Sequence, residues 1–197
     1  MESKSLKKIS QFSDLPANES LEVSDLMALI LEQIGVEHVF GVPGGAIEPL
    51  YNALARSSRR GGIHPVVARH ESGAAFMADG YARETGQLGV CCSTAGPGAT
   101  NMITGIASAY QDQIPLLVIT AQTGLRTFGR GAVQESSCTG INTVGMMQYC
   151  TRYNTMVSHV DQLERKLCNA IMAAMRYPRG PAHISIPLDI LRESVQP

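Results

Sequence analysis

From residue 22 onward the sequence alternates between helical and strand-like hydrophobic periods, and this alternation limits the possible folds more than any other feature. Short apolar runs that fit strands are HVFGV, IHPVV, LGVCCST, PLLVIT, YCTRYNTMV and AHISI. Helical segments lie between most of them. Several of these runs are apolar throughout, as in parallel sheets that helices cover on both faces. The sequence therefore predicts an α/β fold with three layers and a mostly parallel sheet of six strands.

The ends of the helices and of the domain can also be predicted. Ser24 is expected to cap the first helix, and Ser158 with Asp161 to form a capping box before the last one. One continuous helix is expected over 98–110. A chain of 197 residues, 44% of them hydrophobic, suits one core. We expect a polar tail over 1–21, one domain over 22–192 and the start of a linker over 193–197.

Composition excludes several classes of partner. The net charge of -1 gives no electrostatic basis for binding nucleic acid or a membrane surface. The longest apolar runs are too short to cross a bilayer, and the first twenty residues lack the apolar core of a secretory signal. Five cysteines without a C-x-x-C pair are expected to be small buried hydrophobes in a reducing, cytoplasmic compartment. The histidine spacings predict no metal site.

Ligands of open parallel sheets bind at the carboxyl ends of the strands, so the turns there are the places to look for a site. In GVPGGAIEP, Pro43 is followed by Gly44 and Gly45, which would let a ligand approach the backbone closely. An ordinary tight turn would have the same residues.

The stretch ARHESGAA places one carboxylate, Glu71, at the next turn. A glutamate in the first turn of a helix is usually a solvated partner of the helix dipole. Here a thin helix rich in alanine and glycine follows, and such a helix can bury its first turn. A partly buried carboxylate with one hydrogen-bond partner is a candidate for proton transfer.

Two further turns contain polar residues among glycines. TAGPGATN nearly matches the dinucleotide fingerprint G-x-G-x-x-G, but Asn101 replaces the third glycine. No acidic residue ends the following strand, so NAD is not expected, and the P-loop pattern does not occur. In FGRGAVQES, Gln134 and Glu135 lie among glycines, which suggests a mobile loop that presents an amide. A polar loop without a function would look the same.

Taken in order, GVPGGA, RHESGAAFMADGYAR, TAGPGATN, IPLLVITAQ, AVQES and RGPAHISIPLDI resemble the pyrimidine-binding (PYR) domain of thiamine-diphosphate enzymes. Among these enzymes the chain is most similar to the acetolactate synthases, also called acetohydroxyacid synthases. The resemblance covers residues 22–192. It implies a 2-oxo acid carboligase, which decarboxylates pyruvate and condenses the product with a second 2-oxo acid.

The resemblance implies two catalytic residues. The glutamate that matches Glu71 hydrogen-bonds N1′ of the cofactor's aminopyrimidine ring and promotes loss of the thiazolium C2 proton. The glutamine that matches Gln134 lies near the thiazolium and the substrate. The cofactor-binding positions that match the family's motifs are Pro43, Gly44, Gly45, Glu71, Pro97, Asn101 and Gln134.

The same resemblance implies partners. Thiamine diphosphate would be shared with a separate diphosphate-binding domain, which holds Mg²⁺ through a G-D-G…N motif that this sequence lacks. A homodimer or tetramer is implied, because the pyrimidine-binding face normally meets another subunit. FAD contact is implied near Gln113, where the residue type differs from the common serine. The chain would be either an excised domain or a naturally split subunit.

Departures from the family pattern leave other functions open. Val42, Gly124, Leu125 and Val133 replace the tyrosine, proline, arginine and phenylalanine that synthases commonly have at these positions. A related thiamine-diphosphate-dependent decarboxylase or acyl transferase is therefore one alternative. A cofactor-free interaction or regulatory module is the other, although it would have no use for Glu71 at its turn.

Overall fold

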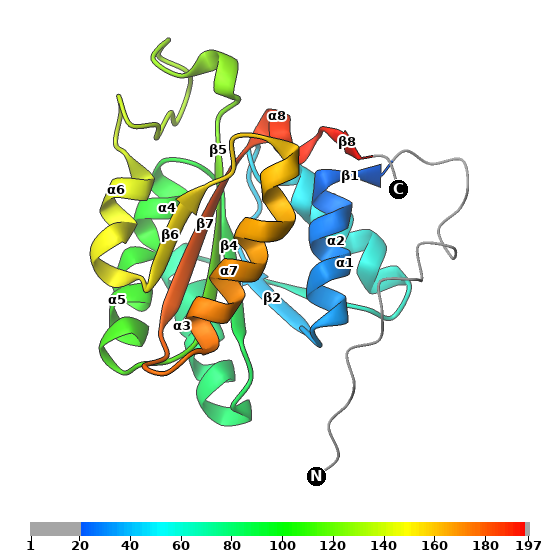
Figure 1. Ribbon diagram of the computed structural model, residues 1–197, viewed down its shortest axis with the longest axis vertical. Coiled ribbons are helices and arrows are strands. Elements are labelled where there is room, and N and C mark those ends of the chain that lie inside the picture. Colours follow the sequence, from blue (N-terminus) through cyan, green and yellow to red (C-terminus); the bar gives the residue numbers. More distant parts are fainter. Residues whose placement is uncertain (1–20, 196–197) are drawn as a thin grey trace.

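The predicted sheet is present and is parallel throughout. The computed structural model describes residues 21–195, and Figure 1 shows the sheet in the middle of the molecule. Its strand order is β3-β2-β4-β5-β7-β6, with every neighbouring pair parallel. The six strands are β2 (His38–Gly41), β3 (His64–Val67), β4 (Gly89–Ser93), β5 (Leu116–Gln122), β6 (Tyr153–Met156) and β7 (Pro181–Pro187).

Helices connect these strands, as the alternation in the sequence predicts. The α-helices are α1 (Val23–Gln33), α2 (Glu48–Arg59), α3 (Glu71–Thr85), α4 (Pro97–Asn101), α5 (Ile103–Gln111), α6 (Thr143–Met147), α7 (Leu163–Met175) and α8 (Leu188–Leu191). A short antiparallel pair, β1 (Leu21–Glu22) with β8 (Ser194–Val195), joins the two ends of the described chain.

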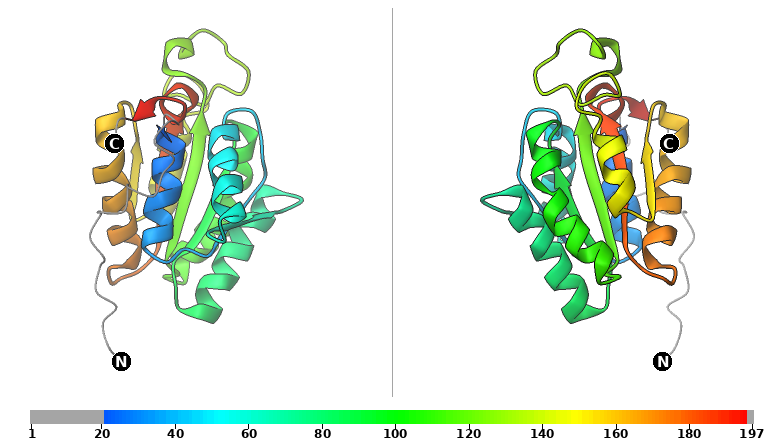
Figure 2. Two further views of the ribbon diagram at one scale, coloured as in Figure 1. Left: turned by 90° about the vertical axis from the view of Figure 1, so that its right-hand side faces the viewer. Right: turned by 90° about the vertical axis from the view of Figure 1, so that its left-hand side faces the viewer.

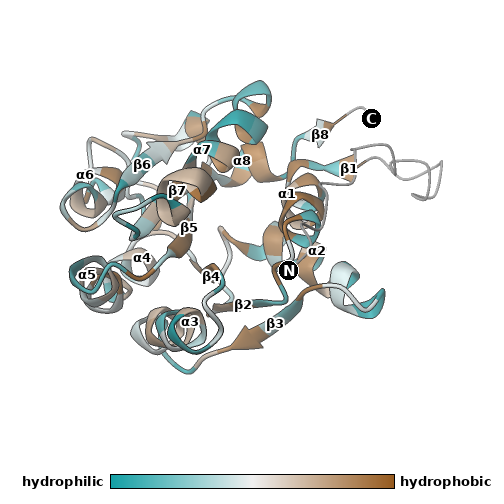
Figure 3. Cartoon of the chain, turned by 60° about the horizontal axis from the view of Figure 1, so that its bottom comes forward, coloured by the Kyte–Doolittle hydropathy of each residue, from teal (hydrophilic) through white to brown (hydrophobic). Residues whose placement is uncertain are grey.

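Two apolar clusters, one on each face of the sheet, make the core. Side chains of α1, α2, α7 and α8 form one cluster, and those of α3, α5 and α6 form the other. Figures 2 and 3 show these two layers of helices with the sheet between them. Successive strand residues point to opposite faces. Cys92 therefore belongs to the first cluster and its neighbour Cys91 to the second.

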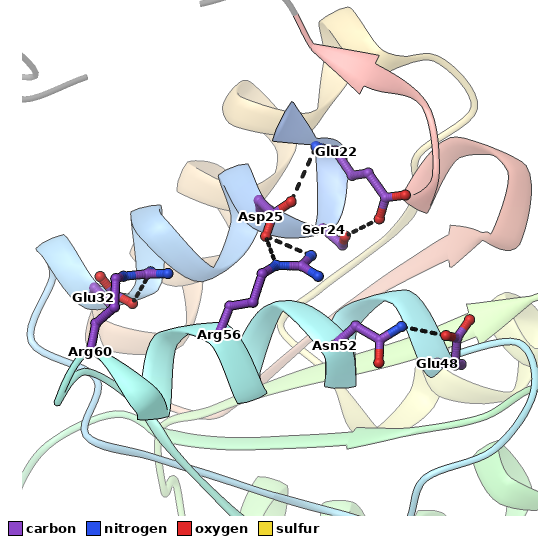
Figure 4. A network of polar contacts seen from close by, with 8 residues as sticks. All are labelled: Glu22, Ser24, Asp25, Glu32, Glu48, Asn52, Arg56 and Arg60. Carbon is purple, nitrogen blue, oxygen red and sulfur yellow. Dashed lines mark hydrogen bonds and ion pairs between the residues drawn. The ribbon is translucent and has the colours of Figure 1, made fainter. Parts of the chain in front are cut away.

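Polar contacts join α1 to α2 along their exposed sides. The guanidinium of Arg56 on α2 donates to Asp25 on α1, with Nε 2.8 Å from Oδ1. Arg60 reaches Glu32 one turn further along, at 3.3 Å. Figure 4 shows both pairs bridging the two helices. These partly exposed pairs contribute little to stability, so α1 and α2 pack mainly through their buried apolar residues in the first cluster.

Three local predictions are wrong. Ser24 lies inside α1, which is capped by Glu22, with Asp25 closing a capping box. Before α7, both the amide and the hydroxyl of Ser158 bond to Gln162 and not to Asp161. The helix predicted over 98–110 is broken at Met102 into α4 and α5.

Two of the five cysteines also differ from the prediction. Cys91, Cys92 and Cys150 are buried, whereas Cys138 and Cys168 are exposed. All five are free thiols. Burial raises the pKa of the Cys92 thiol to about 12, so this thiol packs as a neutral hydrophobe.

The limits of the domain stay a prediction, because the tail predicted over 1–21 lies, except for its last residue, outside the described residues. At the other end, β8 falls within the segment expected to begin a linker, and it pairs with β1. No helix in the described part of the chain is long and apolar enough to cross a membrane.

Candidate functional site

The carboxyl ends of β2 and β4 mark the place where the order of strands reverses. These two strands are neighbours in the sheet, but the chain passes through β3 between them. The turns that leave them therefore run to opposite faces, since α2 packs on one cluster and α3 and α5 on the other. A crevice at such a point is the usual ligand site of an open parallel sheet. The turns at 41–47, 68–71 and 94–97 all open onto this edge.

Glu71 and Asn101 meet at this edge as a carboxylate–amide pair. Glu71 is the first residue of α3, whose cap is His70, and Asn101 is the last residue of α4. Asn101 Nδ2 donates to Glu71 Oε2 over 3.0 Å. Both side chains are half-buried. The carboxylate thus keeps its second oxygen free of described protein donors, next to the backbone of Gly98, and can accept a further hydrogen bond.

Thr94 lies between the two glycine turns and fixes their spacing. A Cβ added at Gly44 would lie 2.7 Å from Thr94 Cβ, and one added at Gly98 would lie 2.8 Å from Thr94 Cγ2. Neither turn could carry a side chain at these positions without displacing Thr94. The hydroxyl of Thr94 is buried and has no hydrogen-bond partner among the described residues. A buried unpaired hydroxyl is costly, and this one lies between two turns of the candidate site, where a bound ligand could supply its partner.

Gln134 packs against the turn after β4, which contains Gly96. The segment between β5 and α6 rises over the carboxyl edge (top of Figure 1) and returns to it at Gln134. A Cβ at Gly96 would lie 2.9 Å from Gln134 Cβ and 3.0 Å from its carbonyl oxygen. The side chain of Gln134 is exposed. The structure therefore brings Gln134 to the turn that carries Pro97.

The other predicted positions are distributed as follows. Pro43 and Gly45 are exposed on the β2–α2 turn, and no atom lies within 4 Å of a Cβ built at Gly45. Glu135 turns away, toward the amide of Gly129 at 2.6 Å, and this bond lowers the pKa of its carboxyl. Gln113 lies in the turn before β5, at the opposite edge of the sheet from Glu71. It is not part of this site.

The sequence reasoning missed the supporting polar residues. Gln122 ends β5 and Ser136 lies two residues after Gln134, and both are buried and bonded to each other. Tyr51 on α2 places its hydroxyl 2.5 Å from where a Cβ at Gly41 would be. Burial raises the pKa of Tyr51 well above its usual range, with smaller contributions from neighbouring groups, of which Cys92 is the first. The position of Gln122 at a strand end was the one available signal.

A family model agrees with this arrangement. Residues 21–143 match the model described as "Thiamine pyrophosphate enzyme, N-terminal TPP binding domain", where pyrophosphate is the older word for diphosphate. The match covers more than half of the chain and includes every turn of the site. The chain belongs to this family.

Curated relatives of the family match along most of the chain. An acetolactate synthase large subunit of Lactococcus lactis is 42% identical over 167 residues, which are 85% of this chain and 28% of the relative. The acetolactate synthase isozyme 2 large subunit of Escherichia coli is 44% identical over 156 residues, 79% of this chain and 27% of the relative. Acetolactate synthase 3, chloroplastic, of Brassica napus is 38% identical over 180 residues, which are 91% of this chain and 26% of the relative. This member of the family thus spans between a quarter and three-tenths of those relatives.

The residues present fit the pyrimidine half of thiamine diphosphate. A half-buried carboxylate with a free oxygen is an acceptor for a ring N–H, and the amide of Asn101 lies beside it. The glycines leave backbone uncovered on two sides, and the buried hydroxyl of Thr94 lacks a partner. Within residues 21–195 no group of three or more His, Cys, Asp or Glu side chains could hold a metal ion. These residues therefore fit the ring, and the described part of this chain offers no metal cluster for the diphosphate.

Proposed function

We propose that this chain is the pyrimidine-binding half of an acetolactate-synthase-like enzyme, a 2-oxo acid carboligase. The observation that carries the proposal is the Glu71–Asn101 pair at the point where the strand order reverses, between the turns at 44–45 and 96–98. Relatives named acetolactate synthase support it, at 42% and 44% identity.

In this proposal Glu71 holds a proton between its carboxylate and the ring nitrogen of the bound pyrimidine. Asn101 fixes the orientation of the carboxylate through the bond to Oε2. Partial burial strengthens the contact, because fewer waters screen it. Thiamine diphosphate, when bound, supplies a nucleophilic carbon for the keto group of a 2-oxo acid and accepts the electron pair left after decarboxylation. Gln134 places its exposed amide on the substrate side of the turn.

The missing parts of the site are proposed to come from elsewhere. A diphosphate-binding domain, on the same polypeptide or on another, would hold Mg²⁺ and the diphosphate group. A homodimer or tetramer would bring such domains to this edge of the sheet. We also propose FAD binding near Gln113 and a cytoplasmic location, for both of which the sequence supplies the only support.

We also propose a second reaction as an alternative, because two side chains near the turns are smaller than the aromatic residues typical of synthases. Val42 follows β2 directly, and Val133 precedes Gln134 with 86% of its surface exposed. We propose that aliphatic residues in place of aromatic ones would leave more room beside these turns. A decarboxylase or acyl transferase that uses the same cofactor would act through the same Glu71. Product analysis with pyruvate in the assembled enzyme separates these reactions, since only a carboligase forms acetolactate.

The experiment that tests the proposal compares thiamine binding by the wild-type chain and by Glu71→Gln. We expect weak but saturable binding in an NMR titration, with shifts of the Asn101 side-chain amide. The substitution removes the acid that shares the ring proton, and affinity falls about 10-fold or more, as for a lost hydrogen bond to a charged group. In the assembled enzyme the same change should remove most C2 proton exchange of the cofactor.

Glu84→Gln is the matched control, because Glu84 lies exposed near the other end of α3. It should bind thiamine like the wild-type chain. Equal affinities of wild type and Glu71→Gln would contradict the assignment of Glu71. An absence of any thiamine binding, also with a diphosphate-binding half added, would favour a cofactor-free interaction module.

A further inference from the structure

The backbone of Gln134 adopts a conformation that this residue type rarely takes. Its φ is 60°, in the left-handed region that favours glycine. Such a conformation costs on the order of 1 kcal/mol or more and persists where the surroundings determine it. Gln134 is also exposed, so burial of its own side chain does not compensate for this cost. The contacts that hold it must therefore lie in its neighbours.

One part of the support is Gly96, in the turn after β4. Gly96 has φ 60° and ψ −119°, and a side chain there would collide with three atoms of Gln134. The backbone of Gln134 thus lies directly on the backbone of Gly96. Pro97 and the first turn of α4 follow at once, and α4 ends at Asn101.

The other part is a buried polar clamp between Ser136 and Gln122. The Ser136 hydroxyl donates to Gln122 Oε1 over 2.8 Å and accepts from the amide of Gly96 over 3.2 Å. Gln122 Nε2 donates to the carbonyl oxygen of Ser136 over 2.8 Å. Ser136 and Gln122 are each 1% exposed. Every polar group in this clamp is paired, which makes a buried network rigid.

We propose that Gln122 and Ser136 are positioning residues, which hold Gln134 on the Gly96 turn as part of the rigid frame of the sheet. This inference rests on the proposed function only for the role of Gln134. It divides the segment over 123–142 into two parts with different supports. In this proposal the clamp ties Gln134 to β4 and β5, whereas residues 124–133 are held by other contacts, such as the amide of Leu125 on Asp189 and that of Gly129 on Glu135.

The rest of the segment has a separate support, which makes the clamp testable by itself. Glu135 accepts bonds from the amide of Gly129 and from the hydroxyls of Ser137 and Thr139. Ser137 contacts neither Gly96 nor Gln122 in any hydrogen bond of the described residues. Adjacent serines therefore serve two different supports, and Ser137→Ala is a matched control for Ser136→Ala.

The test follows the backbone of Gln134 by NMR in the wild-type chain and in Ser136→Ala. In the wild-type chain we expect a strong intraresidue NOE between the amide and α protons of Gln134, as φ near +60° requires. Ser136→Ala leaves the Gly96 amide and the Gln122 oxygen without partners. Amide exchange of Gly96 should accelerate about 10-fold or more, as expected when about 1.4 kcal/mol of local protection is lost, and the NOE of Gln134 should weaken. Ser137→Ala should leave both signals unchanged.

Gly96→Ala is a second variant, which displaces Gln134 by collision and leaves the Ser136 hydroxyl in place. It should weaken the same NOE, and far-UV circular dichroism checks that each variant is folded. An unchanged Gln134 signal in both variants overturns the proposal.

A titration with thiamine then tests this inference and the proposed function separately. In the wild-type chain it should shift the side-chain amides of both Asn101 and Gln134, and in Ser136→Ala that of Asn101 alone. If thiamine shifts neither amide in the wild-type chain, the proposed function fails while the NOE still decides the clamp. Equal shifts of the Gln134 amide in wild type and Ser136→Ala overturn the positioning role.

Discussion

Gly44 and Gly45 look equivalent in the sequence, but the structure gives them different constraints. A Cβ at Gly44 would be 2.7 Å from Thr94 Cβ, while one at Gly45 meets nothing within 4 Å. Neither residue has a positive φ, so conformational strain does not separate them. The first glycine is needed for packing of the turn against Thr94, directly after β4. The second leaves backbone open on the solvent side.

We therefore expect Gly44→Ala to lower the free energy of unfolding by about 1–3 kcal/mol, as for overpacking of a tight contact. Gly45→Ala is the control and should change it by less than about 0.5 kcal/mol. Urea unfolding followed by circular dichroism measures both. Thr94→Ala in the Gly44→Ala background should restore only part of the loss, because it removes Cγ2 and Oγ1, each 2.9 Å from the added Cβ, but keeps Thr94 Cβ at 2.7 Å. Equal losses for the two alanine variants would mean that Thr94 does not limit the turn.

At the scale of the elements, α3 and α5 pack through small residues. Ion pairs connect them near their ends. Gly105 of α5 lies against Ala75 of α3, with Ala75 Cβ only 2.6 Å from the position of a Cβ. At the far end Arg83 Nε donates to the buried Asp79 over 2.9 Å, and its Nη2 donates to Asp112 over 2.6 Å. These bonds raise the pKa of Arg83, and Asp79 lies on the same helix one turn earlier.

Arg83→Ala should lower the free energy of unfolding by about 1–2 kcal/mol, because it leaves the Asp79 carboxylate buried without its cation. The exposure of Arg83 keeps the loss below that of a fully buried pair. Asp112→Ala removes the exposed partner only, and we expect a change near zero. Chemical denaturation of both variants at low and high salt measures the difference. An equally stable Arg83→Ala chain would show that Asp79 finds water instead.

Helices and strands were predictable where a short stretch of sequence determines them. Hydrophobic periodicity located all six strands of the sheet, and helices pack on both of its faces. The first helix cap was mispredicted because β1 pairs with β8, and this pairing fixes where the chain enters α1. The break falls at Met102, which is fully buried in the same apolar cluster as the alanines of α3. Contacts between distant residues decide both features, and no short stretch of sequence reports them.

The residues of the candidate site were likewise predictable only in part. The pattern of turns at strand ends pointed to Glu71 and Gln134, and the family resemblance added Asn101, because sheet topology brings strand ends together. The clamp of Gln122 and Ser136 spans 14 residues across an irregular loop, and its serine resembles any loop serine. Candidate ligand-binding residues can thus be proposed from turn patterns and a family resemblance, whereas the residues that hold them require the fold.

Across the whole molecule, the candidate site lies at one edge of the sheet, and a buried hydrogen-bonded histidine lies in its middle. His183 lies in the middle of β7, fully buried. Its Nε2 lies 2.8 Å from Thr120 Oγ1 on β5, and its Nδ1 lies 2.6 Å from Asn154 Oδ1 on β6. Both partners are uncharged. Burial lowers the pKa of His183 to about 3, so the ring stays neutral in the folded chain.

Global stability should consequently fall in mild acid. Between the folded pKa of about 3 and the unfolded pKa of about 6.5, only the unfolded chain binds this proton, so acid favours unfolding. The full contribution is present above pH 6.5, and about 2 kcal/mol is lost between pH 7 and pH 5. Urea unfolding at these two pH values measures it. His183→Gln retains hydrogen-bonding groups but cannot titrate, so its loss over the same interval should be smaller by that amount. His159→Gln, at an exposed position, should lose as much as the wild-type chain. If His183→Gln loses as much as the wild-type chain, the acid sensitivity arises outside this strand, and the buried histidine does not couple the sheet to pH.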